Sequence, residues 1–154
     1  MAVQGQPKSF LKKYKFIIEC DRIGDTGFQK CSELESDIEV NEYAEGGSIY
    51  DTKDAGRNKF TNLTLTRGES LDDNDLYNWH LECAAAGADL GGVGDSYKSN
   101  MDVVSQNRDG STGKRWRLFN AWPKRVKVGD WDNSSSEHLM NEAEIVFDYF
   151  IRVP

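Results

Sequence analysis

The chain has 154 residues, of which 38% are hydrophobic, and it carries a formal net charge of −7 at pH 7. This length predicts one domain with its own core, and the four Trp, six Tyr and seven Phe argue against disorder. The acidic balance disfavours binding to a nucleic-acid backbone through the overall field. No apolar run of about 18 residues is present, so a membrane-spanning helix is not expected.

The start of the chain is polar and has no apolar stretch typical of a signal peptide, so we expect synthesis in the cytoplasm. Residues 1–12 are predicted to form a flexible N-terminal arm of a single domain that spans 1–154. The cysteines Cys20, Cys31 and Cys83 are odd in number and scattered, which predicts buried thiols rather than a disulfide framework.

The amino-terminal third is predicted to form three strands, because apolar and polar residues alternate there with a period of two. These strands span about 13–23, 27–34 and 36–43, with a turn at 24–27 between the first two. Ile38 and Val40 of the third strand are expected to face inward.

Residues 44–59 are predicted to form a long extended loop, because they contain several glycines and charges and show little periodicity. Loops of this length are uncommon in compact domains and are usually functional. A fourth strand is expected over about 60–67, with Leu63 and Leu65 on one face.

A helix is predicted over about 71–86, where Leu76, Trp79, His80 and Cys83 recur at helical spacing. Ser70 is a candidate N-cap, with Asp73 three residues later. The glycine-rich residues 87–99 are expected to form a surface loop.

The last third is predicted to be strands again. They span about 101–107 and 114–122, with a hairpin turn at Asp109–Gly110, and then 125–131, with Pro123 ending or bulging the strand at a sheet edge. A long final strand is predicted from the inward positions Ala143, Ile145, Phe147, Tyr149, Ile151 and Val153. The whole pattern predicts a mostly β, antiparallel sandwich or barrel-like fold with one packed helix.

Motifs for chemistry are weak. His80 and Cys83 have a metal-ligand spacing, but tetrahedral zinc needs about two more ligands, so a packed core histidine is favoured. Residues 130–141 start like a calcium loop but lack its glycine and its final glutamate. The acidic cluster 69–75 is explained by helix capping. We therefore expect no enzyme activity, no cofactor and no metal.

A basic run is more informative, because six of the 19 basic residues fall within 14 positions: Lys114, Arg115, Arg117, Lys124, Arg125 and Lys127. Trp116, Phe119 and Trp122 interleave with them, as in a nucleic-acid platform. The acidic remainder of the chain argues against this, and Trp116, Leu118 and Trp122 are expected to share a core face. A contact with an acidic patch of another copy is the alternative, and an ordinary solvated face stays possible.

Several segments resemble the inner-tube proteins of contractile phage tails and phage-tail-like contractile injection systems. They are Phe16–Asp21, Gly27–Phe28, Cys31–Glu35, Glu42–Gly47, Asn62–Gly68, Leu76–Trp79 and Trp116–Pro123. The Asn120–Pro123 and Cys31–Glu35 segments are the most specific. One departure is Thr52–Gly56, where family members often have a Lys/Arg-Leu-Pro-Gly turn.

The resemblance implies a structural subunit that forms hexameric rings, which stack into a hollow tube for DNA or protein cargo. The implied partners are further copies of the chain, a sheath, a baseplate with its spike and a tape-measure protein, without membrane insertion. The final location would be a virion tail or injection particle. We also expect part of the acidic excess to line the lumen.

The loop at 44–59 is expected to reach a neighbouring subunit or ring. The residues predicted at contacts between subunits are Glu42, Tyr43, Glu45, Gly46, Gly47, Tyr50, Arg57, Lys59, Arg115, Arg117, Lys124 and Arg125. Two other functions stay open: a type VI secretion-type ring protein that carries effectors, and a nucleic-acid-binding β-barrel.

Overall fold

The computed structural model of the protein describes residues 10–23, 27–72, 74–87 and 96–154. Within these ranges the elements in chain order are β1 (Phe16–Cys20), β2 (Lys30–Cys31), β3 (Ser36–Tyr43), β4 (Thr52–Phe60), β5 (Leu63–Gly68), α1 (Asp75–Gly87), β6 (Ser99–Gln106), β7 (Thr112–Val128), β8 (Met140–Val146) and β9 (Tyr149–Val153). Every strand pair is antiparallel. The predicted mostly β fold with a packed helix is therefore confirmed, although its sheets are open rather than closed into a barrel.

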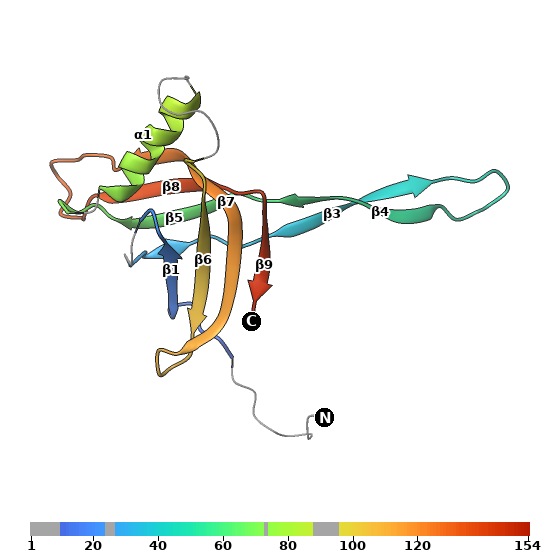
Figure 1. The fold of residues 1–154 in the computed structure, drawn as a ribbon, viewed down its shortest axis with the longest axis horizontal. Coiled ribbons are helices and arrows are strands. Elements are labelled where there is room, and N and C mark those ends of the chain that lie inside the picture. Colours follow the sequence, from blue (N-terminus) through green and yellow to red (C-terminus); the bar gives the residue numbers. More distant parts are fainter. Residues whose placement is uncertain (1–9, 24–26, 73, 88–95) are drawn as a thin grey trace.

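Strand β7 belongs to two sheets and joins them. Its first half lies in sheet A, with the order β1-β6-β7-β9, and its second half lies in sheet B, with the order β7-β8-β5-β2. The bend falls at Asn120, which has a φ of 55° and adjoins a register shift against β6. A bulge of this kind bends a strand, and Figure 1 shows the strands of sheet A running across the direction of sheet B.

The hydrophobic core fills the angle between the two sheets. Ile18, Met101 and Leu118 of sheet A point into it, as do Leu63 and Leu65 of sheet B. The burial of Leu118, Leu63 and Leu65 agrees with their predicted faces. Burying one such side chain contributes roughly 2 kcal/mol, so the inward row of each strand strongly favours the observed register.

The helix begins later than the capping pattern predicts. It starts at Asp75, and the hydroxyl of Ser70 instead accepts a hydrogen bond from the Asp72 backbone N–H, at 3.3 Å, in the preceding turn. Asn74, a residue type that favours the N-cap, comes directly before the helix.

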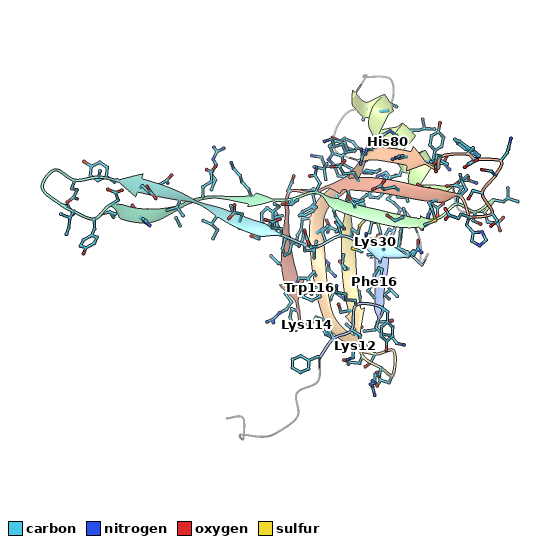
Figure 2. The ribbon with its side chains drawn as sticks, turned by 180° about the vertical axis from the view of Figure 1, so that it is seen from behind. Lys12, Phe16, Lys30, His80, Lys114 and Trp116 are labelled. Atoms are coloured by element: carbon cyan, nitrogen blue, oxygen red, sulfur yellow. The ribbon has the colours of Figure 1, made fainter. Side chains whose placement is uncertain are left out.

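The helix packs against β7. Trp79 is buried and donates its indole N–H to the carbonyl of Tyr97, at 2.6 Å. His80, a residue of α1 that Figure 2 labels, has its Nδ1 3.1 Å from the carbonyl oxygen of Pro123. Because a carbonyl oxygen only accepts, Nδ1 carries the proton and donates. His80 is thus a half-buried packing residue, as the sequence favours.

Strands β3 and β4 form a two-stranded sheet of their own, called the arm below. Figure 1 shows it extending well beyond the two main sheets. The prediction of a loop over 44–59 was wrong, because Thr52–Phe60 is strand and only 44–51 connects it to β3. The strand was missed because β4 contains only two apolar residues, Ala55 and Phe60, which do not recur with a period of two.

The final predicted strand is two strands in different sheets. The chain turns at Phe147–Asp148, where the Asp148 N–H donates to the carbonyl of Phe119 at 3.0 Å. Beyond this turn Phe150 packs on the core, whereas Tyr149 and Ile151, predicted to face inward, are exposed.

Several other boundaries also differ from the predicted ones. The predicted strand at 27–34 shrinks to Lys30–Cys31, and the predicted strand at 13–23 shrinks to β1. Pro123 lies at a register shift in the part of β7 that forms an edge of sheet B, so the bulge alternative is correct. Of the three residues predicted to share a core face, Leu118 is buried in the core, and Trp122 packs against it and edge-on against Tyr97, whereas Trp116 is only half-buried.

The three cysteines are free thiols, and Cys20 and Cys83 are buried while Cys31 is half-buried. Burial raises the pKa of Cys31 and Cys83 to about 11.

Predictions for residues 1–9, the turn at 24–26, Asp73 and residues 88–95 lie outside the described residues. Nowhere in the described ranges is a helix both long and apolar enough to cross a membrane.

Candidate assembly surfaces

The arm has one apolar and one polar face, although both are open to solvent. Val40 lies opposite Ala55 and Ile38 lies two residues before it, so these three share a face, which continues into Phe60 at the base. Ile38 and Val40 are 51% and 59% exposed, and Phe60 already packs on the core cluster. The apolar face of the arm, defined as Ile38, Val40, Ala55 and Phe60, therefore runs from the core into solvent.

The other face of the arm is charged. Asp37 lies opposite Lys59, and Lys59 pairs with Glu39, whose hydrogen bond raises the pKa of the Lys59 ammonium. Gly56 closes the bulge between the two strands, where a Cβ atom would lie 3.0 Å from the Glu39 carbonyl oxygen. A side chain would therefore distort the arm at this point.

Half of the predicted contact residues lie at the tip of the arm: Glu42, Tyr43, Glu45, Gly46, Gly47 and Tyr50. Gly47 has a φ of 87°, a conformation that favours glycine. Tyr43 and Tyr50 are exposed, and so is Ile49, which sequence reasoning missed. Its isolated position in a polar loop gave no periodic signal. Arg57 and Lys59, the other predicted residues of this region, lie on β4.

Arg115 and Arg117 lie far from the arm, on the face of sheet A that points away from the core. There they form an ion-pair network with Glu19 and Asp102, which connects β1, β6 and β7. The Arg115 Nη1 lies 2.5 Å from Glu19 Oε2 and 2.6 Å from Asp102 Oδ2, and the Arg117 Nε lies 2.9 Å from Asp102 Oδ1. Two positive and two negative charges thus cancel within the subunit.

Asp102 is the central member of this network and is only 8% exposed. Burial alone would raise the pKa of Asp102, but hydrogen bonds from Arg117 and Arg115 outweigh this effect and hold the pKa below its usual range. Hydrogen bonds to Glu19 and to Asp102 raise the pKa of the Arg115 guanidinium, and the hydrogen bond to Asp102 raises the pKa of the Arg117 guanidinium. Asp102 and both arginines are therefore charged at neutral pH.

Lys124 and Arg125 occupy a third place, on the half of β7 that lies in sheet B. The Arg125 Nε is 3.5 Å from Glu144 Oε2, and a hydrogen bond from Asn62 lowers the pKa of Glu144. The predicted contact residues therefore do not form one cluster, and three of the six arginines and lysines in the basic run already have acidic partners within the chain.

Sheet A has two edge strands, β1 on one side and β9 on the other. Each has five residues and, among the described strands, no partner on its outer side. Unpaired edges of this kind offer backbone hydrogen-bonding groups to another chain. Within the described ranges, no three His, Cys, Asp or Glu side chains gather in a way that could hold a metal ion.

The chain matches a known protein family. Residues 12–151 match the model of the T4-like virus tail tube protein gp19 family. A search of curated protein sequences found no match.

Solved structures resemble the fold over nearly its whole length. A chain in the structure of the anti-feeding prophage cap, a tube-terminating cap, has a TM-score of 0.80 at 22% identity, and 99% of each chain is covered. A chain of the sheath–tube complex of an extracellular contractile injection system, in the extended state, has a TM-score of 0.77 at 21% identity, covering 93% of this chain and 90% of the other. A type six secretion system protein has a TM-score of 0.56 at 9% identity, covering 90% and 82%.

Proposed function

The chain belongs to the T4-like virus tail tube protein family, and from this premise we propose that it is the structural subunit of an inner tube, which assembles as hexameric rings stacked into a hollow conduit. The observation that carries the proposal is the match over residues 12–151, together with the two edge strands of sheet A, which have no outer partner among the described strands. Its partners would be further copies, a sheath, a baseplate with its spike and a tape-measure protein.

The free edges support closure into a ring. If β9 of one copy pairs with β1 of the next, every edge of sheet A is covered and a continuous sheet surrounds the lumen. Six copies of the four strands would give about 24 strands, which at about 4.8 Å spacing make a circumference of about 115 Å and a width of about 37 Å between opposite backbones. Strand tilt would widen this further.

In such a ring the lumen would be lined by the outer face of sheet A, since the other face packs on the core. The charged residues there, Glu19, Asp102, Arg115 and Arg117, cancel one another. Between them stand uncharged side chains such as Ile17 and Ile151. This arrangement gives a nearly neutral lumen and does not support the expectation that acidic residues line it. Either a polypeptide or DNA could pass through without strong binding.

The arm supports contact between copies. A two-stranded ribbon is marginally stable by itself, and the apolar face of the arm leaves Ile38 and Val40 in water. We propose that this face packs on a neighbouring subunit. A role as a type VI secretion-type effector carrier is the weaker alternative, because the likeness to the type six protein is lower, with a TM-score of 0.56 against 0.80 and 0.77.

Negative-stain microscopy and sedimentation of the purified chain test the proposal. Rings or tubes are the expected result, and a monomer at high concentration would contradict it. The variant Ile38→Ser with Val40→Thr should reduce the sedimenting fraction, because it removes apolar contact area without touching the core. Asp37→Asn on the polar face is the matched control and should assemble normally. If the double variant assembles like the control, the arm makes no such contact.

A further inference from the structure

The charges of the chain are separated between two ends of the molecule, and β7 runs from one end to the other. The basic end lies where β7 begins, beside the start of β1, the β6–β7 turn and the last residues of β9. Its cations are Lys12, Lys13, Lys15, Arg108, Lys114 and Arg152. Asp109 is the acidic residue among them, so this end carries about +5. The whole chain carries −7.

The basic end is a continuous surface rather than scattered side chains. Lys12, Lys15 and Arg108 line one shallow hollow, and Lys114 and Arg152 line another. Leu11 lines the first hollow and Gly113 lines the second. These two residues are so close that a Cβ atom at Gly113 would lie 2.8 Å from the Leu11 side chain, so the two hollows adjoin. Figure 2 shows Lys12 and Lys114 at the same free end of sheet A.

The acidic end lies where β7 finishes. It consists of the lead-in to α1 and the connection from β7 to β8, which the backbone N–H of Glu69 joins by donating to the carbonyl of Leu139 at 2.8 Å. Five exposed acids gather there: Asp72, Asp75, Asp130, Asp132 and Glu137. No lysine or arginine occurs in the described residues 69–72, 74–87 and 129–139.

Both ends also expose large apolar side chains. Phe10 and Tyr14 are 74% and 70% exposed at the basic end, and Leu71 and Trp131 are 96% and 76% exposed at the acidic end. An end that only needed to stay hydrated would carry charges without these side chains. Aromatic and aliphatic anchors surrounded by charge are typical of protein interfaces.

We propose that the basic end of one copy docks on the acidic end of another copy, head to tail, and that this contact controls how subunits of the tube polymerise. The inference rests on the proposed function. A second copy is the occupant because it supplies the complementary charge and apolar side chains, whereas the chain's net charge repels a polyanion. A heterologous contact of this kind propagates unless it closes.

Charge exchange between the two ends provides the test. The variant Lys12→Glu with Lys114→Glu reverses part of the basic end, and Asp130→Lys with Glu137→Lys reverses part of the acidic end. For each variant alone, sedimentation should give an association constant for polymerisation that is about tenfold lower than that of the wild type, which corresponds to about 1.4 kcal/mol. An equimolar mixture of the two should polymerise again, because each end then meets its opposite charge.

The control is Lys30→Glu with Lys127→Glu. It changes the net charge by the same amount as the reversed basic end, but both residues lie on sheet B, where Figure 2 shows Lys30. It should polymerise like the wild type. Polymerisation of the wild type should also weaken from about 0.1 M to about 1 M NaCl, as the Debye length falls from about 10 Å to about 3 Å. Far-UV circular dichroism of every variant establishes that it is folded.

Failures of the two proposals are distinguishable. If the wild type forms no rings or tubes, the proposed function is wrong. If it does form them, and the reversed basic end polymerises normally or the mixture fails to recover, the docking of the two ends is wrong. Retention of a labelled oligonucleotide by the wild type, lost in Lys12→Glu with Lys114→Glu while polymerisation is unchanged, would also overturn the docking and assign the basic end to nucleic acid.

Discussion

Replacing Asp102 by asparagine tests whether the ion-pair network holds sheet A together. The carboxylate accepts three hydrogen bonds, one from Arg115 and two from Arg117, at 2.6, 2.9 and 3.2 Å. Asparagine keeps the shape but removes the charge. One of the two acceptor oxygens is replaced by an NH2 group that faces an arginine donor, and β6 loses its charged connection to β7.

The size of the effect follows from burial. A hydrogen bond to a charged group contributes about 1.5–3 kcal/mol when removal leaves a buried partner unsatisfied. Arg117 is partly exposed, with 38% of its side chain accessible, and Arg115 keeps Glu19, so water and Glu19 recover part of the loss. We expect a loss of about 2 kcal/mol, or about 4–8 °C in Tm for a domain of this size.

The effect depends on pH with a definite sign. The folded-state pKa of Asp102 lies below the unfolded value, which is about 3.9. The contribution is therefore complete above the unfolded pKa and disappears as the pH falls through the lower folded pKa. The Tm difference between wild type and Asp102→Asn should be constant from about pH 7 to about pH 5 and shrink at more acidic pH.

Thermal unfolding followed by circular dichroism, at a concentration where no polymer sediments, measures this difference. Asp109→Asn is the control, because its pKa is also lowered, by a hydrogen bond from Ser111, but the group is fully exposed. It should leave Tm almost unchanged at neutral pH. Equal Tm values for wild type and Asp102→Asn at pH 7, or a difference that persists undiminished in strong acid, would refute this reasoning.

Three further predictions concern the backbone, the thiols and the arm. Gly129→Ala should cost about 1–2 kcal/mol in chemical denaturation, since Gly129 has a φ of 51° and a Cβ would meet Leu139, whereas Gly46→Ala, in open space, should cost less. Cys31 and Cys83 should react slowly with a disulfide reagent at about pH 8, because burial raises their pKa to about 11, and react fully in denaturant. Amides of the arm should exchange rapidly in dissociated subunits and slowly in tubes; fast exchange in tubes would contradict its burial.

Sequence patterns were sufficient for the strands that contribute to the core. Leu63 and Leu65 are buried as their alternation predicts, and their strand, expected over about 60–67, is Leu63–Gly68. In these segments one buried side chain in two determines both the strand and its face. The family resemblance added the tube-protein fold, which the family match confirms.

The arrangement of the candidate surfaces was not predictable in the same way. Glu19 and Arg115 are separated by 96 positions, and their pairing depends on the register of β1, β6 and β7 rather than on a local pattern. The bend at Asn120 depends on a φ of 55°. Asparagine tolerates this φ, but an asparagine in the sequence does not by itself predict it. Without this register and bend, the basic run read as one patch, although it lies on two sheets.

The apolar residues that were wrongly predicted to be buried in the core share a physical feature. Ile38, Val40 and Ile151 alternate with polar neighbours as core residues do, yet all three are exposed, on the arm and on the β9 edge strand. Alternation indicates that a face is buried but not which molecule buries it. On the proposed ring, a neighbouring copy covers Ile38 and Val40, whereas Ile151 lines the lumen. Exposed apolar positions on the arm therefore indicate where the core of the assembly extends beyond the core of the subunit.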